Sequence, residues 1–254
     1  MTVLAVLAAL VVGAGASLAA EVIMARRAWG PPLCPYCQEP YSQGRWSVVL
    51  SSLTGRRFCG RCGQPLRWQR LAGELLLVVL WGTLVARYGW SWRVALAMLA
   101  GVPLVMVLVT DLETRLIPNR IMYPAIAAMA VFGLFMGPAV PGSGSWTWWQ
   151  SLAGGAVGLG VFWVLVVLGT LVWGEGALGY GDVKLAAYIG LVVGFPLVIE
   201  ALVLTFVFGF VGAVFLLLSR KGSLRSFFPY GPFLVLGAVT TMLWGVEIVV
   251  WYLR

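Results

Sequence analysis

The chain has 254 residues, of which 61% are hydrophobic and only 10% are charged, with a net charge of +8. A soluble globular domain carries about 45–50% apolar and about 25% charged residues. The chain therefore cannot cover its surface with polar groups, which excludes a soluble domain, collagen, a coiled coil, a disordered tail and a disulfide-rich secreted domain. We predict an all-α polytopic membrane protein.

Long apolar runs predict about eight transmembrane helices, since about 20 apolar residues cross a bilayer as a helix. In chain order the runs are 3–24, 71–86, 94–110, 121–140, 148–173, 185–199, 201–218 and 233–253. The sixth and seventh runs are separated only by Gly194, Pro196 and Glu200. No basic stretch precedes the first run, so we expect an uncleaved span and not a signal peptide.

The positions of Lys and Arg predict the orientation. Of the 17 Lys and Arg residues, only Arg87, Arg93 and Arg254 fall in outer segments if both termini lie outside the cytoplasm. This is a strong positive-inside pattern. It predicts three parts: a first transmembrane helix at 1–24, a cytoplasmic loop at 25–70, and a seven-helix membrane core at 71–254. The basic residues then lie in cytoplasmic loops, where they interact with anionic lipids, so we expect membrane lipids and no nucleic acid as partners.

All four cysteines lie in the predicted cytoplasmic loop, as Cys34-Pro35-Tyr36-Cys37 and Cys59-Gly60-Arg61-Cys62. Two Cys-x2-Cys pairs at this distance suit one structural Zn²⁺ held by four thiolates. A loop of about 45 residues with few apolar side chains cannot build a core, so metal binding would supply its folding free energy. A redox pair and reduced free thiols are the alternatives.

Chemistry at the membrane must come from few groups, because the chain has no His and only two Asp residues, Asp111 and Asp182. This excludes Ser-His and Cys-His pairs and any His-ligated metal. Asp111 follows an apolar run on the cytoplasmic side. It could simply mark the membrane boundary, but a carboxylate after a span faces the unfavourable end of its own helix dipole.

Asp182 lies in the segment Gly179-Tyr180-Gly181-Asp182-Val183-Lys184-Leu185, at the start of a span. One interpretation is a helix N-cap with flexible residues before it. The glycines also allow a substrate backbone to approach the carboxylate closely. The spacing matches neither the Walker nor the dinucleotide pattern, which excludes a phosphate loop. Two Asp side chains at one membrane face, sharing one proton, are typical of aspartic peptidase chemistry.

These motifs together resemble a known family. The sequence GYGDVKL at 179–185 is similar to the Gly-x-Gly-Asp motif of intramembrane aspartic peptidases, and Asp111 with Leu116-Ile117-Pro118-Asn119 resembles the other motif of type IV prepilin peptidases. The paired-Cys loop, the FPYGPF segment at 228–233 and the eight spans also match. The resemblance covers the whole chain. The two motifs are specific in combination, in this order and with this loop.

The resemblance implies a function. Such enzymes of the bacterial inner membrane cut the basic leader from prepilins and pseudopilins at the cytoplasmic face, after a Gly. Members with the Cys loop commonly also methylate the new N-terminus with S-adenosylmethionine. The catalytic pair would be Asp111 and Asp182, and zinc would be held by Cys34, Cys37, Cys59 and Cys62. The predicted substrate-binding residues are Gly179, Gly181, Lys184 and Glu74.

Two departures bear on methylation. The usual Gly-Ser-Phe-Leu-Asn-Val-like segment is replaced by residues 15–22, GASLAAEV, and an Asn-Ile-Pro-like segment between the Cys pairs is replaced by residues 43–47, QGRWS. Neither affects the peptidase pair. Glu74 could alternatively form an ion pair with Arg70.

Two other classes of function remain open at the level of sequence. A transporter or channel with a zinc-stabilised loop would use the two acids for cations or protons, although such sites usually lie near the membrane midplane. An assembly scaffold without chemistry would leave the Gly-x-Gly-Asp sequence unexplained.

Overall fold

The computed structural model describes residues 2–25, 33–34, 36–40, 47–55, 58–141, 147–174, 179–218 and 230–254. Within these ranges the regular structure is helical, with isolated β-bridges only beside the cysteines. The helices are α1 Thr2–Ala25, α2 Val48–Leu53, α3 Trp68–Tyr88, α4 Trp92–Thr114, α5 Asn119–Met136, α6 Trp148–Trp173, α7 Tyr180–Val193, α8 Leu197–Leu218 and α9 Gly231–Tyr252.

The structure confirms the prediction of an all-α polytopic membrane protein. Seven of the described helices are long and apolar enough to cross a membrane: α1, α3, α4, α5, α6, α8 and α9. The sixth predicted run corresponds to α7, which has only 14 residues. That is about 21 Å of helix, which is shorter than the hydrocarbon core of about 30 Å. The helix break lies at 194–196, earlier than the predicted boundary between residues 199 and 201, because Gly194 has a φ of 74° and Pro196 follows; α8 begins at Leu197.

Helix boundaries follow local chemistry. The fifth predicted run, 148–173, coincides with α6, which starts with a capping box between Thr147 and Gln150 and ends before Gly174. The fourth run was expected to reach residue 140, but α5 stops at Met136. Gly137 has a φ of 73°, a left-handed conformation that ends helices, and Pro138 follows it. Helix α2 was not predicted.

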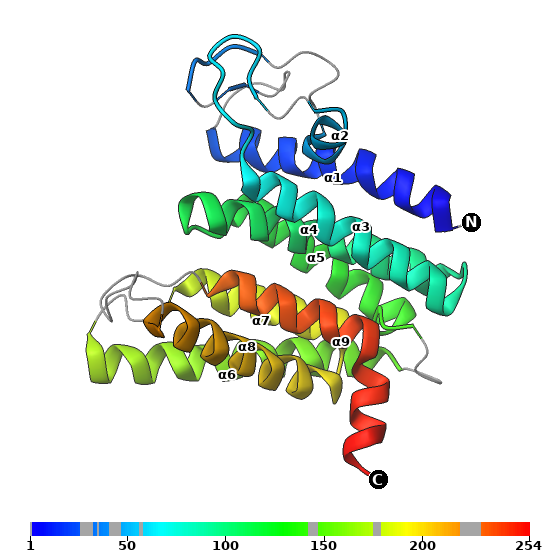
Figure 1. Cartoon of the computed structure of the whole chain (residues 1–254). Coiled ribbons are helices and arrows are strands. Elements are labelled where there is room, and N and C mark those ends of the chain that lie inside the picture. The colour runs from blue at the N-terminus through cyan, green and yellow to red at the C-terminus, as the bar shows by residue number, and fades with distance from the viewer. Residues whose placement is uncertain are drawn as a thin grey trace.

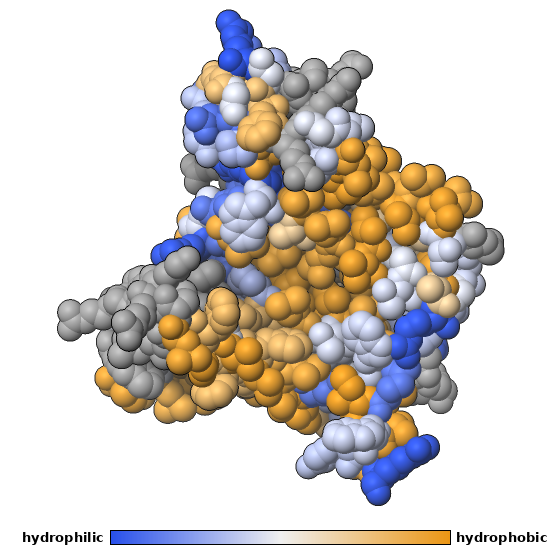
Figure 2. Space-filling view, in the orientation of Figure 1, coloured by the Kyte–Doolittle hydropathy of each residue, from blue (hydrophilic) through white to orange (hydrophobic). Residues whose placement is uncertain are grey.

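The long helices lie alongside one another, and the Cys-containing segment projects from them near α1 and α3 (Figure 1). Helix α1 packs on α3, α3 on α4, α6 on α7, and α8 on α9, while α4 also contacts α5 and α9. Apolar residues cover the middle of the face in Figure 2, with hydrophilic residues gathered near the loop and near the C-terminal end. This is the distribution that a membrane-embedded protein requires.

Helices α4 and α7, which carry the two aspartates, are the most enclosed parts of the core. Of the most apolar part of α4, 72% is buried, and α7 is buried almost continuously from Val183 to Val193. The Tyr188 hydroxyl of α7 is buried and donates a 2.8 Å hydrogen bond to the carbonyl of Ala100 in α4. The two helices are therefore held in a fixed relation by a polar bond within an apolar core.

Helix α7 packs backbone to backbone against α6. A Cβ on Gly154 or Gly158 of α6 would collide with the carbonyl oxygens of Gly190 and Ala186, and a Cβ on Gly190 would collide with Gly154. Small residues at such spacing let membrane helices approach closely. The contact places α7, and with it Asp182, against α6.

Some predicted features lie outside the described residues. These are Phe228 and Pro229 of the FPYGPF segment, residues 43–46 between the Cys pairs, Pro35, and the basic residues Arg26, Arg27, Arg45, Arg56, Arg57, Arg220, Lys221 and Arg225.

The close contact between α6 and α7 gives a stability prediction. Gly154→Ala should lower the thermal unfolding midpoint of detergent-solubilised protein, because the added methyl group meets backbone that cannot rotate away, at a cost of about 1–3 kcal/mol. Gly160→Ala is the matched control, since it lies on the same helix with nothing within 4 Å of a Cβ. Gly160→Ala should leave the midpoint unchanged or raise it, because Ala favours helix by about 1 kcal/mol. Equal effects of the two changes would contradict the packing argument.

Candidate active site and metal centre

Asp111 lies in the last turn of α4, but its carboxyl group faces the start of another helix. The side chain is buried, and the backbone N–H of Gly231, the first residue of α9, interacts with it. A Cβ on Gly231 would lie 2.6 Å from Oδ2 of Asp111, so only glycine allows this approach. The carboxylate thus lies at the positive end of the α9 dipole, which resolves its unfavourable position at the end of α4.

Asp182 is the third residue of α7 and is half-buried. The backbone N–H of Gly179, the N-cap residue, donates to its carboxylate, which is one half of a capping box. The carboxylate also interacts electrostatically with Asp111. The structure therefore brings the only two aspartates of the chain together, each at the N-terminus of a helix.

One carboxylate oxygen of the aspartate pair has no hydrogen-bond partner among the described residues. Oδ2 of Asp111 is buried and makes no hydrogen bond with any residue that the structure describes. Buried carboxylate oxygens are normally paired, so an unpaired one at this point needs a functional explanation. A proton or a water molecule shared with a second acid would satisfy it.

The turn between α4 and α5 packs against the start of α7. Ile117 fills the space beside Gly181, where an added Cβ would lie 2.9 Å from the Ile117 Cβ. The Lys184 ammonium donates a 2.6 Å hydrogen bond to Asn119 Oδ1 and lies 5.0 Å from the ring centre of Tyr123. The two motifs recognised in the sequence are therefore in direct contact.

Glu74 has a different environment from the aspartates. It is fully buried in α3 and accepts hydrogen bonds from the Ser47 hydroxyl (2.7 Å) and from the N–H groups of Val48 and Val49 (3.0 Å each). It therefore caps the N-terminus of α2 from a neighbouring helix. The guanidinium of Arg70 lies 3.9 Å from Glu21 of α1.

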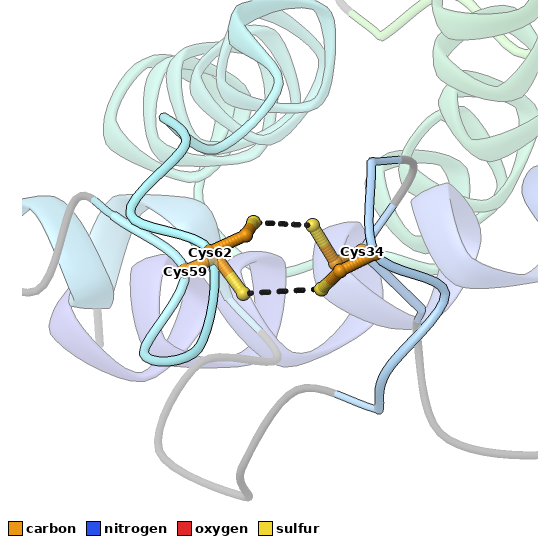
Figure 3. Close-up of side chains that lie close together, drawn as sticks. Cys34, Cys59 and Cys62 are labelled. Atoms are coloured by element: carbon orange, nitrogen blue, oxygen red, sulfur yellow. Dashed lines mark hydrogen bonds between the residues drawn. The ribbon is translucent and has the colours of Figure 1, made fainter.

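The four cysteines form two matched knuckles that face each other (Figure 3). In each knuckle the residue four positions after the first Cys donates a hydrogen bond to that Cys carbonyl: Gln38 to Cys34 (2.8 Å) and Gly63 to Cys59 (3.0 Å). Gln38 and Gly63 both have positive φ, at 59° and 69°. The two knuckles thus share the same closing hydrogen bond and the same left-handed closing residue.

The geometry of the four thiols fits a tetrahedral metal ion. The sulfur atoms all lie within 4.8 Å of one another, with 3.6 Å between Cys34 and Cys62 and 3.8 Å between Cys37 and Cys59. Zn–S bonds of about 2.3 Å in a tetrahedron require sulfur atoms about 3.8 Å apart. None of the four cysteines forms a disulfide, since these separations exceed a disulfide bond of about 2.05 Å. The cluster can therefore hold a metal such as zinc.

The pKa values of the thiols also bear on metal binding. A backbone hydrogen bond from Glu39 lowers the pKa of Cys37, but desolvation and the neighbouring thiols together raise it to about 12. The pKa of Cys59 is lowered by backbone hydrogen bonds from Cys62 and Arg61. Four adjacent thiolates repel one another, and a bound divalent cation would supply the compensating charge.

An ion pair joins the metal loop to the end of α4. Arg67, just before α3, donates a 2.7 Å hydrogen bond to Glu113, two residues after Asp111. The cysteine loop and Asp111 therefore lie at the same end of the helices. No local pattern predicts this pair, because its members are far apart along the chain.

Comparison with known proteins supports the resemblance. The model of the type IV leader peptidase family matches residues 98–214, a range that contains both aspartates. A prepilin leader peptidase/N-methyltransferase of Pseudomonas putida is 30% identical over 201 residues, which cover 79% of this chain and 67% of that protein. The chain belongs to the type IV leader peptidase family.

Further relatives extend the match. A prepilin leader peptidase/N-methyltransferase of Bacillus subtilis is 28% identical over 221 residues, covering 87% of this chain and 84% of that protein, and one of Aeromonas hydrophila is 28% identical over 220 residues, covering 87% and 73%. No solved structure matches the chain significantly. As a member of the type IV leader peptidase family, the chain is an integral membrane peptidase.

The metal centre gives a second prediction. We expect purified, reduced protein to contain about one zinc ion per chain, and Cys34→Ser or Cys59→Ser to lose it and to make the loop sensitive to protease, because metal supplies the folding free energy of such loops. Metal analysis and limited proteolysis check this. Gln64→Ala is the control, since this exposed residue contributes its backbone carbonyl, and not its side chain, to the Cys59 knuckle. Zinc-free wild-type protein with an intact loop would contradict the prediction.

Proposed function

We propose that the chain cleaves the leader peptide from type IV prepilins and pseudopilins at the cytoplasmic face of a bacterial inner membrane, with Asp111 and Asp182 as its catalytic pair. The observation that carries the proposal is the meeting of the only two aspartates of the chain at the N-termini of α7 and α9. The relatives are named prepilin leader peptidases, which supports prepilins as the substrate class. The positive-inside pattern supports the cytoplasmic side.

The proposed reaction needs only the two carboxyl groups and water. One proton is shared by the pair, so one acid is ionised and the other is neutral. The ionised carboxylate accepts a proton from water as the water oxygen attacks the scissile carbonyl carbon, while the neutral acid donates a hydrogen bond to the developing oxyanion. The C–N bond then breaks as a proton passes to the leaving amine, and the shared proton is restored.

The remaining predicted substrate residues fit this scheme unequally. Gly179 borders Asp182, since a Cβ there would lie 3.3 Å from Asp182 Oδ2, so it leaves room for a peptide backbone beside that carboxylate. The space beside Gly181 is filled by Ile117, so we propose that Gly181 allows the two motifs to pack and does not contact the peptide. Lys184 and Glu74 already bond Asn119 and α2. We therefore propose that these two position the elements around the site and do not contact the peptide.

The catalytic pair gives a third prediction. Asp111→Asn and Asp182→Asn should each abolish nearly all cleavage of a prepilin in proteoliposomes, because each keeps its shape but cannot share the proton. The double variant should be little worse than either single one, since the pair acts as a unit. Gel shift or mass spectrometry of the pilin provides the measurement.

Glu247→Gln is the control for the catalytic prediction, because it also removes one carboxylate from a helix but lies in the C-terminal half of α9, where it pairs with Arg87. It should cleave normally. Substantial cleavage by a folded Asn variant at Asp111 or Asp182 would end the proposal of an aspartic pair.

We also propose that the chain methylates the new N-terminal amine with S-adenosylmethionine. This proposal is supported by the names of the relatives, which include N-methyltransferase, and by the presence of the Cys loop. The donor is charged and soluble, so it must approach from water, at the membrane face that carries the loop. The amine is produced at the same face, because Arg67 and Glu113 tie the loop to the end of α4 beside Asp111.

Methylation gives a fourth prediction. Cys34→Ser should lose methylation while cleavage continues, because the loop is the part that unfolds and the catalytic pair lies among the membrane helices. The mass of the processed pilin, with the donor present, reports both activities in one sample. Wild-type protein that cleaves but leaves the N-terminus unmethylated would remove the methyltransferase proposal and leave the peptidase proposal standing.

A further inference from the structure

Tyr230, the N-cap residue of α9, carries a hydroxyl group that the fold does not use. Its Oη atom is buried and makes no hydrogen bond with any residue within the described ranges. Its ring packs among Phe162, Phe206 and Phe233, with centroids 6.1–6.4 Å away. The other members of this aromatic cluster are phenylalanines, and Phe at position 230 would pack equally well without burying an unpaired O–H group.

The position of the hydroxyl supplies a reason for its presence. Tyr230 interacts electrostatically with Asp182, and the next residue, Gly231, contacts the carboxyl group of Asp111. The Tyr230–Gly231 dipeptide therefore contacts Asp111 and lies within electrostatic range of Asp182. A buried, unpaired donor beside two catalytic carboxyl groups is typical of a group that awaits a substrate oxygen.

Helix α8 also holds the Tyr230 ring in place. A Cβ on Gly209 of α8 would lie 3.1 Å from the Tyr230 Cε2 atom and 3.8 Å from its hydroxyl oxygen, so the ring edge that carries the hydroxyl packs on α8. Helices α6, α8 and α9 thus all contribute to holding this ring. Its orientation is fixed before a substrate binds, which is what electrostatic catalysis requires of a donor.

We propose that Tyr230 is a third catalytic residue of the peptidase, whose hydroxyl donates a hydrogen bond to the scissile carbonyl oxygen as the tetrahedral intermediate forms. The inference rests on the proposed prepilin peptidase function. The hydroxyl keeps its proton throughout, so the proton transfers between water, the two aspartates and the leaving amine are unchanged. Burial, and then the charge of Asp182, raise the pKa of Tyr230 to about 12, which suits a donor and not a base.

The test is the kinetics of Tyr230→Phe in proteoliposomes with a prepilin substrate. We expect kcat to fall about 10- to 1,000-fold, the range found when one oxyanion donor is removed, with KM changed less than about threefold. A substrate peptide whose scissile carbonyl is replaced by a secondary hydroxyl mimics the intermediate. Its affinity should fall far more than that of the substrate.

Two further measurements separate catalysis from packing and positioning. Phe206→Leu disturbs the same aromatic cluster but keeps the hydroxyl, so it should lower thermal stability at least as much as Tyr230→Phe, with a far smaller loss of kcat. The pH profile of Tyr230→Phe should keep the midpoints of wild type. A shifted profile would overturn the proposal, because it would assign the hydroxyl to Asp182 and not to the substrate.

The outcomes distinguish this inference from the proposed function. Wild-type activity that Asp182→Asn abolishes and Tyr230→Phe leaves intact would overturn the role of Tyr230 alone. Absence of cleavage by wild-type protein on several prepilins would overturn the prepilin function, and the role of Tyr230 with it.

Discussion

Placing two carboxyl groups among apolar helices is the constraint on which the site depends. An ionised carboxylate is costly to remove from water unless dipoles or hydrogen bonds replace the solvent. Here helix N-termini do so: α7 for Asp182, through Gly179, and α9 for Asp111, through Gly231. Because α4 ends beside the start of α9, the positive end of the α9 dipole compensates Asp111 for its position at the negative end of α4. The position of the start of α9 beside Asp111 is therefore as necessary to the site as either aspartate.

The same constraint explains the packing of α7. Its first turn must reach Asp111, so the helix lies deep in the core, between α6 and the other helices. The glycines shared with α6 permit that depth, and the bond from Tyr188 to Ala100 ties the helix to α4. Glycines in a helix usually weaken it. Here the loss of helix propensity is offset by a close contact that positions Asp182, so stability and the proposed activity depend on the same residues.

Local sequence pattern predicted most of this architecture, but few of the polar contacts between residues that are far apart in the sequence. Apolar runs located the membrane helices, and 148–173 matched α6, because such runs depend only on neighbouring residues. Cys spacing predicted the metal cluster for the same reason. The cap that Glu74 provides to α2, the Arg67–Glu113 pair and the approach of Tyr230 to Asp182 had no local signal. The only sequence clue to Tyr230 was the FPYGPF segment, to which no role was given.

The two polar links between the metal loop and the helices differ in strength. Glu74 is fully buried and accepts three hydrogen bonds, and each buried donor left unpaired would cost about 1–3 kcal/mol. The Arg67–Glu113 pair is partly exposed on the Arg side and contributes about 0–1 kcal/mol. Helix α2 should therefore stay attached to α3 when metal is removed, whereas the knuckles should unfold, because among the described residues their buried cluster consists of Cys34 and Cys59 with Cys37 and Leu66 packed against it. Loss of a bound metal should then loosen the residues around the four thiols more than it moves Asp111, because the strong link belongs to α2 and the weak one to the end of α4. The proposed methylation by the loop and the proposed cleavage by the aspartates would respond separately to metal for that reason.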